Sequence, residues 1–240
     1  MSTRWKFWLI TGVTLLALAA TLALGRWQLS RAVQKEVLQG SIDAKAALPK
    51  LDGQALAARA DPASELQRGV NLRGRWMAER TVFLDNRPMN GKPGLYVVTP
   101  MKLEGSAAVV LVQRGWIARN FVDRARLPQL STPAGVIEIQ GRIAPPPAKL
   151  YELGGPDTGL IRQNLDMTRF SAELGLPLLA VSVQQTGVAS EGLLREWPLA
   201  GTGVDKHYGY AFQWFGLSAL IAILYVWFQI VRRFIDRRRA

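Results

Sequence analysis

Two long runs without a charged side chain lie near the two ends of this 240-residue chain. The first extends from Phe7 to Gly25 and the second from Tyr208 to Val231. At about 1.5 Å per residue, helices over these runs measure roughly 28 Å and 36 Å, and the hydrocarbon core of a bilayer is about 30 Å thick. The runs therefore predict two transmembrane helices, which we place at residues 8–25 and 207–231.

A cleaved signal peptide is the alternative interpretation of the first run. Arg4 and Lys6 precede it, and Ala17-Leu18-Ala19 resembles a small-residue cleavage site. The run is nevertheless longer than the usual apolar core of a signal peptide, and it continues into a helix-compatible segment. An uncleaved anchor is therefore the favoured interpretation.

Positive charges beyond the two runs indicate the orientation in the membrane. Residues 1–7 and the basic tail 232–240 carry Lys and Arg, which are retained on the cytoplasmic side. Arg26, Arg31 and Lys35 count against this orientation, but long exported domains cross a membrane largely regardless of charge. We expect both termini in the cytoplasm and residues 26–206 exported, which in a bacterium means a periplasmic domain of an inner-membrane protein.

The segment of residues 26–206 is long enough for one domain, and its pattern is mainly that of strands. Short β-rich runs alternate with turn residues, and "NRPMNGKPG" predicts a hairpin between the second and third runs. The predicted strands are Asn71–Trp76, Thr81–Asn86, Leu95–Met101, Ala108–Ile117, Val136–Ile143 and Leu179–Gln185.

Helices are expected at Gln28–Gln39, continuing the first anchor, and at Met167–Leu174, with Asp166 as its cap. A loop is expected over Ala144–Gly159, and broken helix and linker over Asp43–Glu65. The predicted fold class is a membrane protein with two transmembrane α-helices flanking a mainly antiparallel β (α+β) periplasmic domain.

Composition excludes several function classes. The net charge of +12 is spread over the flanks and the domain, and no basic stripe with interleaved aromatics indicates nucleic-acid binding. The absence of cysteine excludes disulfides, thiolate metal sites and covalent haem attachment through C-x-x-C-H. Nucleotide-binding and hydrolase motifs are also missing. We therefore expect no catalytic residues, a protein that is not an enzyme, and a tail that contacts anionic membrane lipids.

The only histidine of the chain, His207, opens the second apolar run. In a helix, Tyr210, Trp214 and Phe215 follow it at i+3, i+7 and i+8 and share its face. One interpretation is an interfacial aromatic belt with a solvated imidazole, which composition alone puts somewhat ahead. The other is an imidazole that ligates haem iron, with the macrocycle against the aromatic face. These residues alone leave both interpretations open.

Arg114 and Trp116 lie two residues apart in a predicted strand, so we expect them on one face with Val110 and Val112. An arginine stem packed over the indole is the favoured interpretation, because such a pair needs no ligand. The alternative is an Arg114 that meets an acidic partner or a haem propionate.

Four blocks together resemble the surfeit locus protein 1 family, bacterial type, and extend over nearly the whole chain. They are "GRWQLSRAVQKEVL", "LDNRPMNGKPGLYVVTPM", "VVLVQRGWI" and "HYGYAFQWF". Gln113 before Arg-Gly-Trp, and the lack of a tryptophan in "IRQNLDMTRF", depart from the family pattern. The resemblance implies two membrane helices around an exported domain, and a chaperone function in the assembly of haem-copper cytochrome c oxidase of the respiratory chain.

The resemblance also implies transient binding of haem a and delivery to oxidase subunit I, with haem a synthase as a further partner. The family's proposed ligand of the haem iron matches His207, and Tyr210, Trp214 and Phe215 would pack near the macrocycle. Independently of the resemblance, and from its expected depth alone, Arg26 lies just beyond the first helix at the same membrane face and is expected to pair with a propionate. The alternatives are a scaffold that contacts subunit I without binding haem, and an anchored periplasmic enzyme or solute-binding domain.

Overall fold

The computed structural model describes residues 3–120, 122, 127, 130–151, 159–198 and 203–239. The chain divides into two compact units. One is built from both ends of the chain, up to Ser41 and from Leu199 onward, and the other comprises Ile42–Pro198. We describe each unit by itself.

The terminal unit consists of helices. They are α1 (Thr3–Ala46), α4 (Val204–Tyr225), the π-helical turn η3 (Val226–Val231) and α5 (Arg232–Arg239). By length and composition, Trp5–Ala46 and Val204–Ile235 are apolar enough to cross a membrane. Only 6% of the most apolar window of each is buried within the structure, so these side chains need another apolar cover. A bilayer supplies such a cover, which suggests membrane anchoring at both ends of the chain.

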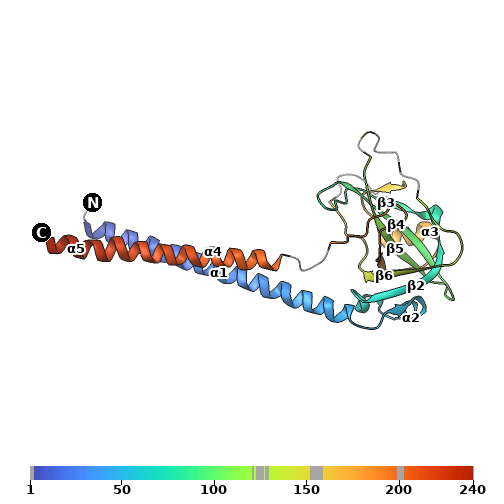
Figure 1. Ribbon diagram of the computed structural model, residues 1–240, viewed down its shortest axis with the longest axis horizontal. Coiled ribbons are helices and arrows are strands. Elements are labelled where there is room, and N and C mark those ends of the chain that lie inside the picture. Colours follow the sequence, from blue (N-terminus) through green and yellow to red (C-terminus); the bar gives the residue numbers. More distant parts are fainter. Residues whose placement is uncertain are drawn as a thin grey trace. The chain divides into compact units, whose positions relative to one another are not determined.

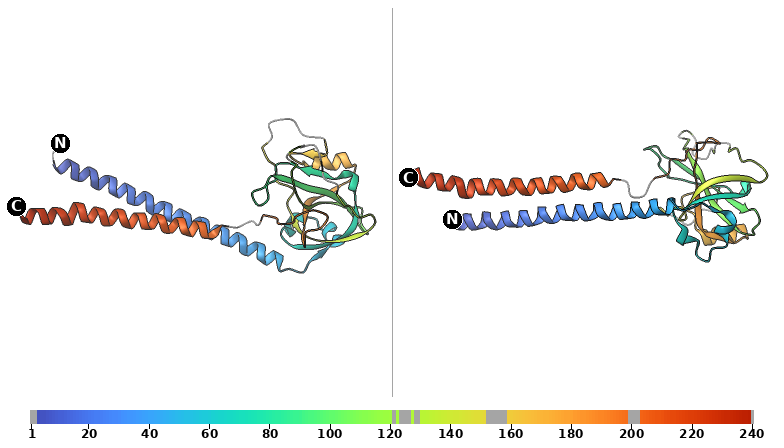
Figure 2. Two further views of the ribbon diagram at one scale, coloured as in Figure 1. Left: turned by 45° about the horizontal axis from the view of Figure 1, so that its top comes forward. Right: turned by 60° about the horizontal axis from the view of Figure 1, so that its bottom comes forward.

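The two long helices run alongside each other in opposite directions (Figures 1 and 2). Buried or half-buried residues recur on each helix at alternating steps of three and four, the spacing of a coiled-coil seam. We call the first set the α1 stripe: Thr11, Thr14, Leu18, Thr21, Gly25, Gln28 and Ala32. The second set is the α4 stripe: His207, Ala211, Trp214, Ser218, Ile221 and Tyr225.

Hydroxyl groups join the two stripes. The Thr11 Oγ1 and the Tyr225 hydroxyl lie 2.8 Å apart, and the Thr21 Oγ1 and the Ser218 Oγ lie 2.6 Å apart. In lipid, helices gain little from burying apolar surface against one another, so small residues and hydrogen bonds between side chains hold such pairs. The helix pair is built in that way.

The π-helical turn η3 controls which side chains beyond Tyr225 face α1. A π turn holds one residue more than an α turn. Arg233, eight positions after Tyr225, places its guanidinium carbon 4.9 Å from the centre of the Phe7 ring. In an uninterrupted α-helix, the residue seven positions on would take that direction. The wide turn therefore keeps the contact between Arg233 and α1.

The second unit is strand-rich. Its strands are β1 (Leu51–Asp52), β2 (Gly69–Trp76), β3 (Val82–Leu84), β4 (Gly94–Leu103), β5 (Val109–Ala118), β6 (Ile137–Ala144), β7 (Ile161–Arg162) and β8 (Leu178–Gln185). Its helical segments are α2 (Gly53–Ala57), η1 (Pro62–Glu65), η2 (Ala78–Arg80) and α3 (Met167–Leu174). Most pairings are antiparallel, whereas β1–β2, β3–β7 and β5–β8 are parallel.

The sheet closes on itself because β2 pairs with both β6 and β4. Within the described residues, the ring β2-β6-β8-β5-β4 is thus a five-stranded barrel, which β3 and β7 extend from β4. The change of partner falls on Gly74, which pairs with Ile137 of β6 and Leu103 of β4. A Cβ at Gly74 would lie 2.3 Å from the Lys102 carbonyl oxygen, so only glycine permits this approach.

Apolar side chains fill the barrel and also cover one outer face. Inside the barrel, the cluster includes Leu72, Met101, Val112, Ile143 and Val183, all with no solvent exposure. A second cluster lies beneath α3, which contributes Phe170. The Asp166 carboxylate caps α3 by accepting hydrogen bonds from the backbone N–H groups of Thr168 and Arg169.

Most strand and helix predictions are confirmed. All six predicted strands are present, β3 and β4 form the predicted hairpin, and α3 begins at Met167 after its Asp166 cap. The predicted linker contains the missed strand β1, and β7 was also missed. No regular element occurs in residues 145–151 of the predicted loop, and residues 152–158 lie outside the described residues.

The prediction that Arg114 and Trp116 share a face is wrong, because Arg114 is the extra residue of a β-bulge. Val97 pairs with Gly115 and Val98 with Gln113, so Arg114 has no partner in β4. A bulge shifts the alternation of side chains by one residue. The Arg114 guanidinium accordingly stacks on Trp76, 4.9 Å from the ring centre, whereas the Trp116 indole donates to the Arg87 carbonyl oxygen at 2.6 Å.

Candidate functional site

His207 lies in the first turn of α4 and is half-buried in the helix pair. Its Nδ1 lies 2.7 Å from the Oε1 of Gln28 on α1. Nε2 has no hydrogen-bond partner among the residues that the structure describes. It is also absent from the set of buried polar atoms that lack a partner, so Nε2 is accessible from outside the helix pair. The helix pair thus presents one imidazole nitrogen that is free to bind a metal.

Small side chains surround this contact on both helices. Ala32 of α1 and Ala211 of α4 are buried, and the Phe215 ring packs over Gly25 so closely that a Cβ there would lie 2.7 Å from Cε1. Close approach of the two backbones is what allows a glutamine on one helix to reach a histidine on the other.

The three aromatic residues expected around the imidazole divide between two directions. Trp214 and Phe215 are half-buried and lie with His207 on the side of α4 that faces α1. Tyr210 is 51% exposed, on the outward side. The structure therefore brings Trp214 and Phe215 to the seam of the helix pair, and leaves Tyr210 beside it.

Arg26, expected to pair with a propionate, is exposed in the middle of α1. It lies two positions before Gln28, which is about 200° around a helix with 3.6 residues per turn. The structure does not bring Arg26 to the Gln28–His207 contact, so its pairing with a propionate stays a prediction without geometric support.

Two polar residues of α1 that touch the beginning of α4 were not predicted. Gln28 bonds to His207, and the Glu36 Oε1 accepts a hydrogen bond of 2.9 Å from the Tyr208 hydroxyl. A signal for Gln28 exists in the sequence, because it continues the three-and-four spacing of Thr21 and Gly25 beyond the uncharged run. The sequence alone does not show that His207 is the partner of Gln28, because that contact depends on how α1 and α4 pair.

Arg114 was the other candidate for an external ligand. Its side chain has no solvent exposure, and its Nη2 pairs with the Glu191 carboxylate at 2.7 Å. Further hydrogen bonds run to the Thr132 hydroxyl and the Ser131 carbonyl oxygen. The guanidinium is thus bound within the strand unit, and it supports the fold rather than a propionate or an acidic partner.

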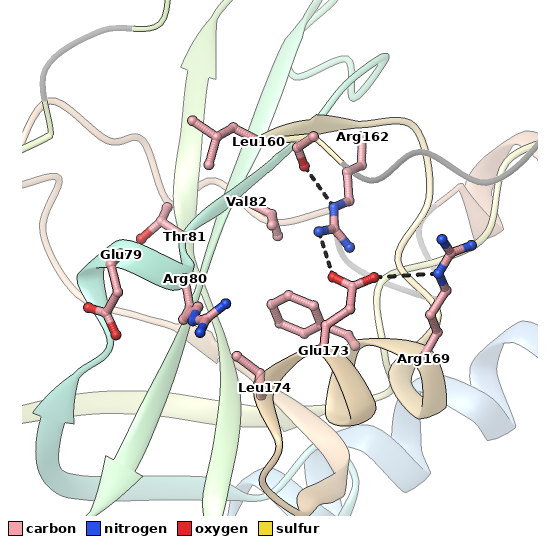
Figure 3. A pocket seen from close by; sticks show the side chains of 11 residues that line it. Glu79, Arg80, Thr81, Val82, Leu160, Arg162, Arg169, Glu173 and Leu174 are labelled. Carbon is pink, nitrogen blue, oxygen red and sulfur yellow. Dashed lines mark hydrogen bonds and ion pairs between the residues drawn. The ribbon is translucent and has the colours of Figure 1, made fainter.

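The strand unit also has a cavity of about 580 Å³ between η2, β3 and α3 (Figure 3). Arg162 and Arg169 both point to Glu173, at 2.7 Å and 3.4 Å from its oxygens. The charges are therefore largely balanced within the cavity wall. Among the described residues, no three His, Cys, Asp or Glu side chains gather where they could hold a metal ion. His207 remains the candidate site.

The fold and site define a class of protein: a strand barrel that lies between two apolar helices in the sequence, with the only histidine of the chain on the seam of the helix pair. The model of the SURF1 family matches residues 15–219, so the chain belongs to the SURF1 family. This is the family of surfeit locus protein 1 indicated by the four sequence blocks, and it is generally linked to the assembly of cytochrome oxidase.

Relatives in bacteria and animals match over most of their length. A SURF1-like protein of Rickettsia felis is 29% identical over 225 residues, which cover 89% of this chain and 94% of the relative. A SURF1-like protein of Rickettsia conorii is 26% identical over 219 residues, 85% of each chain. The SURF1-like protein of Drosophila melanogaster is 27% identical over 245 residues, 91% of this chain and 77% of the relative.

Proposed function

We propose that this protein assists the assembly of cytochrome c oxidase by carrying haem a as transient cargo, with His207 as the ligand of the haem iron. The observation that carries the proposal is the free Nε2 of the only imidazole, at the beginning of an apolar helix. A neutral histidine nitrogen is a common ligand of haem iron. Membership of the SURF1 family supports the same conclusion.

The donor set fits such a cargo. Haem a is large and apolar, so a carrier needs apolar surface continuous with the bilayer more than a closed pocket. Trp214 and Phe215 supply half-buried aromatic surface close to His207, and the exposed ring of Tyr210 lies one turn away. When bound, haem a would provide the redox-active iron of the recipient enzyme, oxidase subunit I.

The side chains of this protein have three tasks in the proposed transfer. His207 holds the iron through Nε2, and the aromatic rings shield the apolar ring edge. A single protein ligand keeps the complex weaker than one in which the recipient supplies more, so transfer follows the difference in affinity. An assembly factor of this kind needs no catalytic residue, and haem a synthase is the partner that would supply the cargo.

Replacement of His207 by Ala tests the proposal. The variant removes the imidazole without placing a charge in the helix, so the protein should still accumulate. After co-expression with the enzymes that make haem a, we expect haem absorbance in the purified parent protein and its loss or marked change in His207→Ala. Phe212→Ala, on the same helix but 79% exposed, is the matched control and should retain haem. Equal spectra in the parent and His207→Ala would eliminate His207 as the ligand.

The scaffold alternative predicts a different result for the haem absorbance of the purified protein. A scaffold that contacts subunit I without binding haem would carry no haem in any variant, even with a confirmed supply of haem a. Deletion of the protein should lower oxidases that contain haem a and leave other oxidases less affected under both proposals. Ligand binding or turnover by the strand unit would instead favour an enzyme or a solute-binding domain.

We further propose that both termini are cytoplasmic and that the strand unit is exported to the periplasm of a bacterial inner membrane. Arg232 and Arg233 after the second span support this orientation. A reporter fused after Arg239 should behave as cytoplasmic. A reporter inserted at residues 103–106, at the end of β4 and in the turn that follows it, should behave as exported. An exported C-terminus would overturn the two-span topology.

A further inference from the structure

The contact between Gln28 and His207 joins the first and last of the four family-like sequence blocks. The two atoms, Oε1 and Nδ1, are 2.7 Å apart. An amide oxygen accepts hydrogen bonds and cannot donate one, so the proton of this bond belongs to Nδ1. A neutral imidazole carries its proton on one nitrogen only, and Nε2 is then the nitrogen with a free lone pair.

Ligand histidines need such a partner. In metal sites, the nitrogen that does not bind the metal almost always donates its proton to an acceptor, which fixes the tautomer and the orientation of the ring. Gln28 is the acceptor for Nδ1 in the part of the chain that the structure describes. The hydrogen bond therefore does for His207 what an outer-shell acceptor does for a metal ligand.

The neighbours of Gln28 on α1 keep it within reach of the imidazole. Gly25 and Ala32, which precede and follow it in the α1 stripe, are both buried and small. Any side chain at Gly25 would push against Phe215 and increase the distance between the helices. Because its two neighbours on the α1 stripe are small, the long side chain of Gln28 is the one that crosses the seam at the position of His207.

We propose that Gln28 is the positioning residue of this site: it holds the imidazole proton on Nδ1 and leaves Nε2 as the single metal-binding nitrogen. The tautomer assignment stands on the hydrogen bond, and its consequence for haem a rests on the proposed function. The role goes beyond joining two helices, because the hydrogen bond that joins them also determines which imidazole nitrogen is left without a proton.

The single histidine makes the tautomer directly measurable in the full-length protein without haem. With ¹⁵N-labelled histidine, the chain gives one imidazole signal pair in a detergent micelle or nanodisc. For the neutral imidazole, at about pH 8, we expect a protonated Nδ1 and a bare Nε2 in the parent protein. A bare Nδ1 in the parent protein would overturn the proposal.

Three variants separate positioning from packing. Gln28→Leu keeps the bulk but removes the acceptor, and should let the proton distribute to Nε2. Gln28→Glu restores an acceptor oxygen, and Nδ1 should again be protonated. Gln34→Leu makes the same change at an exposed site of α1 and should leave the tautomer as in the parent. An unchanged tautomer in Gln28→Leu would refute the role of Gln28.

A cross-link checks that the helices still pair. Cysteines at Thr21 and Ser218, whose oxygens lie 2.6 Å apart, should form a disulfide in the parent background and in Gln28→Leu, since the chain has no other cysteine. Loss of both the cross-link and the tautomer preference in Gln28→Leu would assign Gln28 a structural role only, against the proposal.

Haem retention then connects the tautomer to the proposed function. Loss of an outer-shell partner typically weakens metal binding about 10- to 100-fold, so Gln28→Leu should retain correspondingly less haem and shift its visible bands. Wild-type retention in Gln28→Leu, despite a changed tautomer, would overturn the functional part of the proposal. A parent protein that binds no haem but shows the Nδ1–H tautomer would contradict the proposed function and leave the Gln28 assignment confirmed.

Discussion

The strand unit buries whole leucine, valine and isoleucine side chains, whereas the helix pair buries glycine, alanine and hydroxyl residues. Water surrounds the first kind of unit and drives large apolar side chains into its core. Lipid is as apolar as leucine, so large side chains gain nothing by leaving it, and small residues with hydrogen bonds between helices decide the contact. The two regions therefore differ in which substitutions they tolerate, and the candidate site belongs to the second.

The largest expected effect is in the strand unit, at the buried ion pair. Arg114→Ala removes a fully buried guanidinium and leaves the Glu191 carboxylate without it, which should cost about 4 kcal/mol of unfolding free energy. Unfolding of the detergent-solubilised protein, followed by tryptophan fluorescence, measures the change. Arg73→Ala breaks an exposed pair with Glu104 and should cost less than about 1 kcal/mol. Similar losses in both variants would contradict this ranking.

A matched pair of leucine truncations compares the two regions directly. Leu111 of β5 has no solvent exposure, and Leu111→Ala should lower the unfolding free energy of the strand unit by about 3 kcal/mol. Leu16 of α1 is 73% exposed, and Leu16→Ala should leave that free energy within about 0.5 kcal/mol. A large effect of Leu16→Ala would mean that its side chain has a protein partner instead of lipid.

These contrasts also explain which parts of the fold were predictable. Alternating apolar residues define strands locally, so Asn71–Trp76 and Leu179–Gln185 were found from the sequence. Closure of the barrel depends on Gly74, which changes partners from β6 to β4, and nothing local distinguishes this glycine from others. The bulge at Arg114 was equally hidden, because a bulge is defined by the register of the opposing strand.

The candidate site was also predicted only in part, because local patterns can be read from the sequence whereas contacts between distant segments cannot. His207 stands out because it is the only histidine and opens an uncharged run. Helical spacing grouped Tyr210 with Trp214 and Phe215 on one wide face of the helix. Spacing alone does not show that α1 covers only the part of this face with Trp214 and Phe215 and leaves Tyr210 exposed. Gln28 lies 179 positions from His207, and only the antiparallel pairing of α1 with α4 brings them together.

In the helix pair, added bulk should be more harmful than lost bulk. Gly25→Leu would place a side chain where even a Cβ lies 2.7 Å from Phe215, and overpacking of this kind costs about 2 kcal/mol. The cysteine pair at Thr21 and Ser218 should then cross-link much less. Gly12→Leu is the control, because a Cβ at Gly12 meets no atom within 4 Å. Equal cross-linking in both variants would show that Gly25 does not set the distance between the helices.

The smallest effect is expected from a single hydrogen bond between the helices. Thr21→Val keeps the shape but removes the oxygen that meets Ser218 at 2.6 Å, and such bonds in membranes contribute about 0.6 kcal/mol. Thr14→Val, on the same α1 stripe, is the control and should change the pairing less. Titration with SDS, read by fluorescence transfer between labels on the two helices, compares them. Equal SDS midpoints for Thr21→Val and Thr14→Val would show that the hydrogen bond between Thr21 and Ser218 does not stabilise the helix pair.

The π turn at Val226–Val231 has a consequence in genetic terms. Loss of one codon from an α-helix turns everything downstream by about 100°, which in most of α4 would carry side chains out of the seam. Within Val226–Val231 the wide turn can give up its extra residue and become an α turn, and Arg233 would then still face Phe7. The last helix therefore contains a short stretch in which length, but not hydropathy, is free to change by one residue.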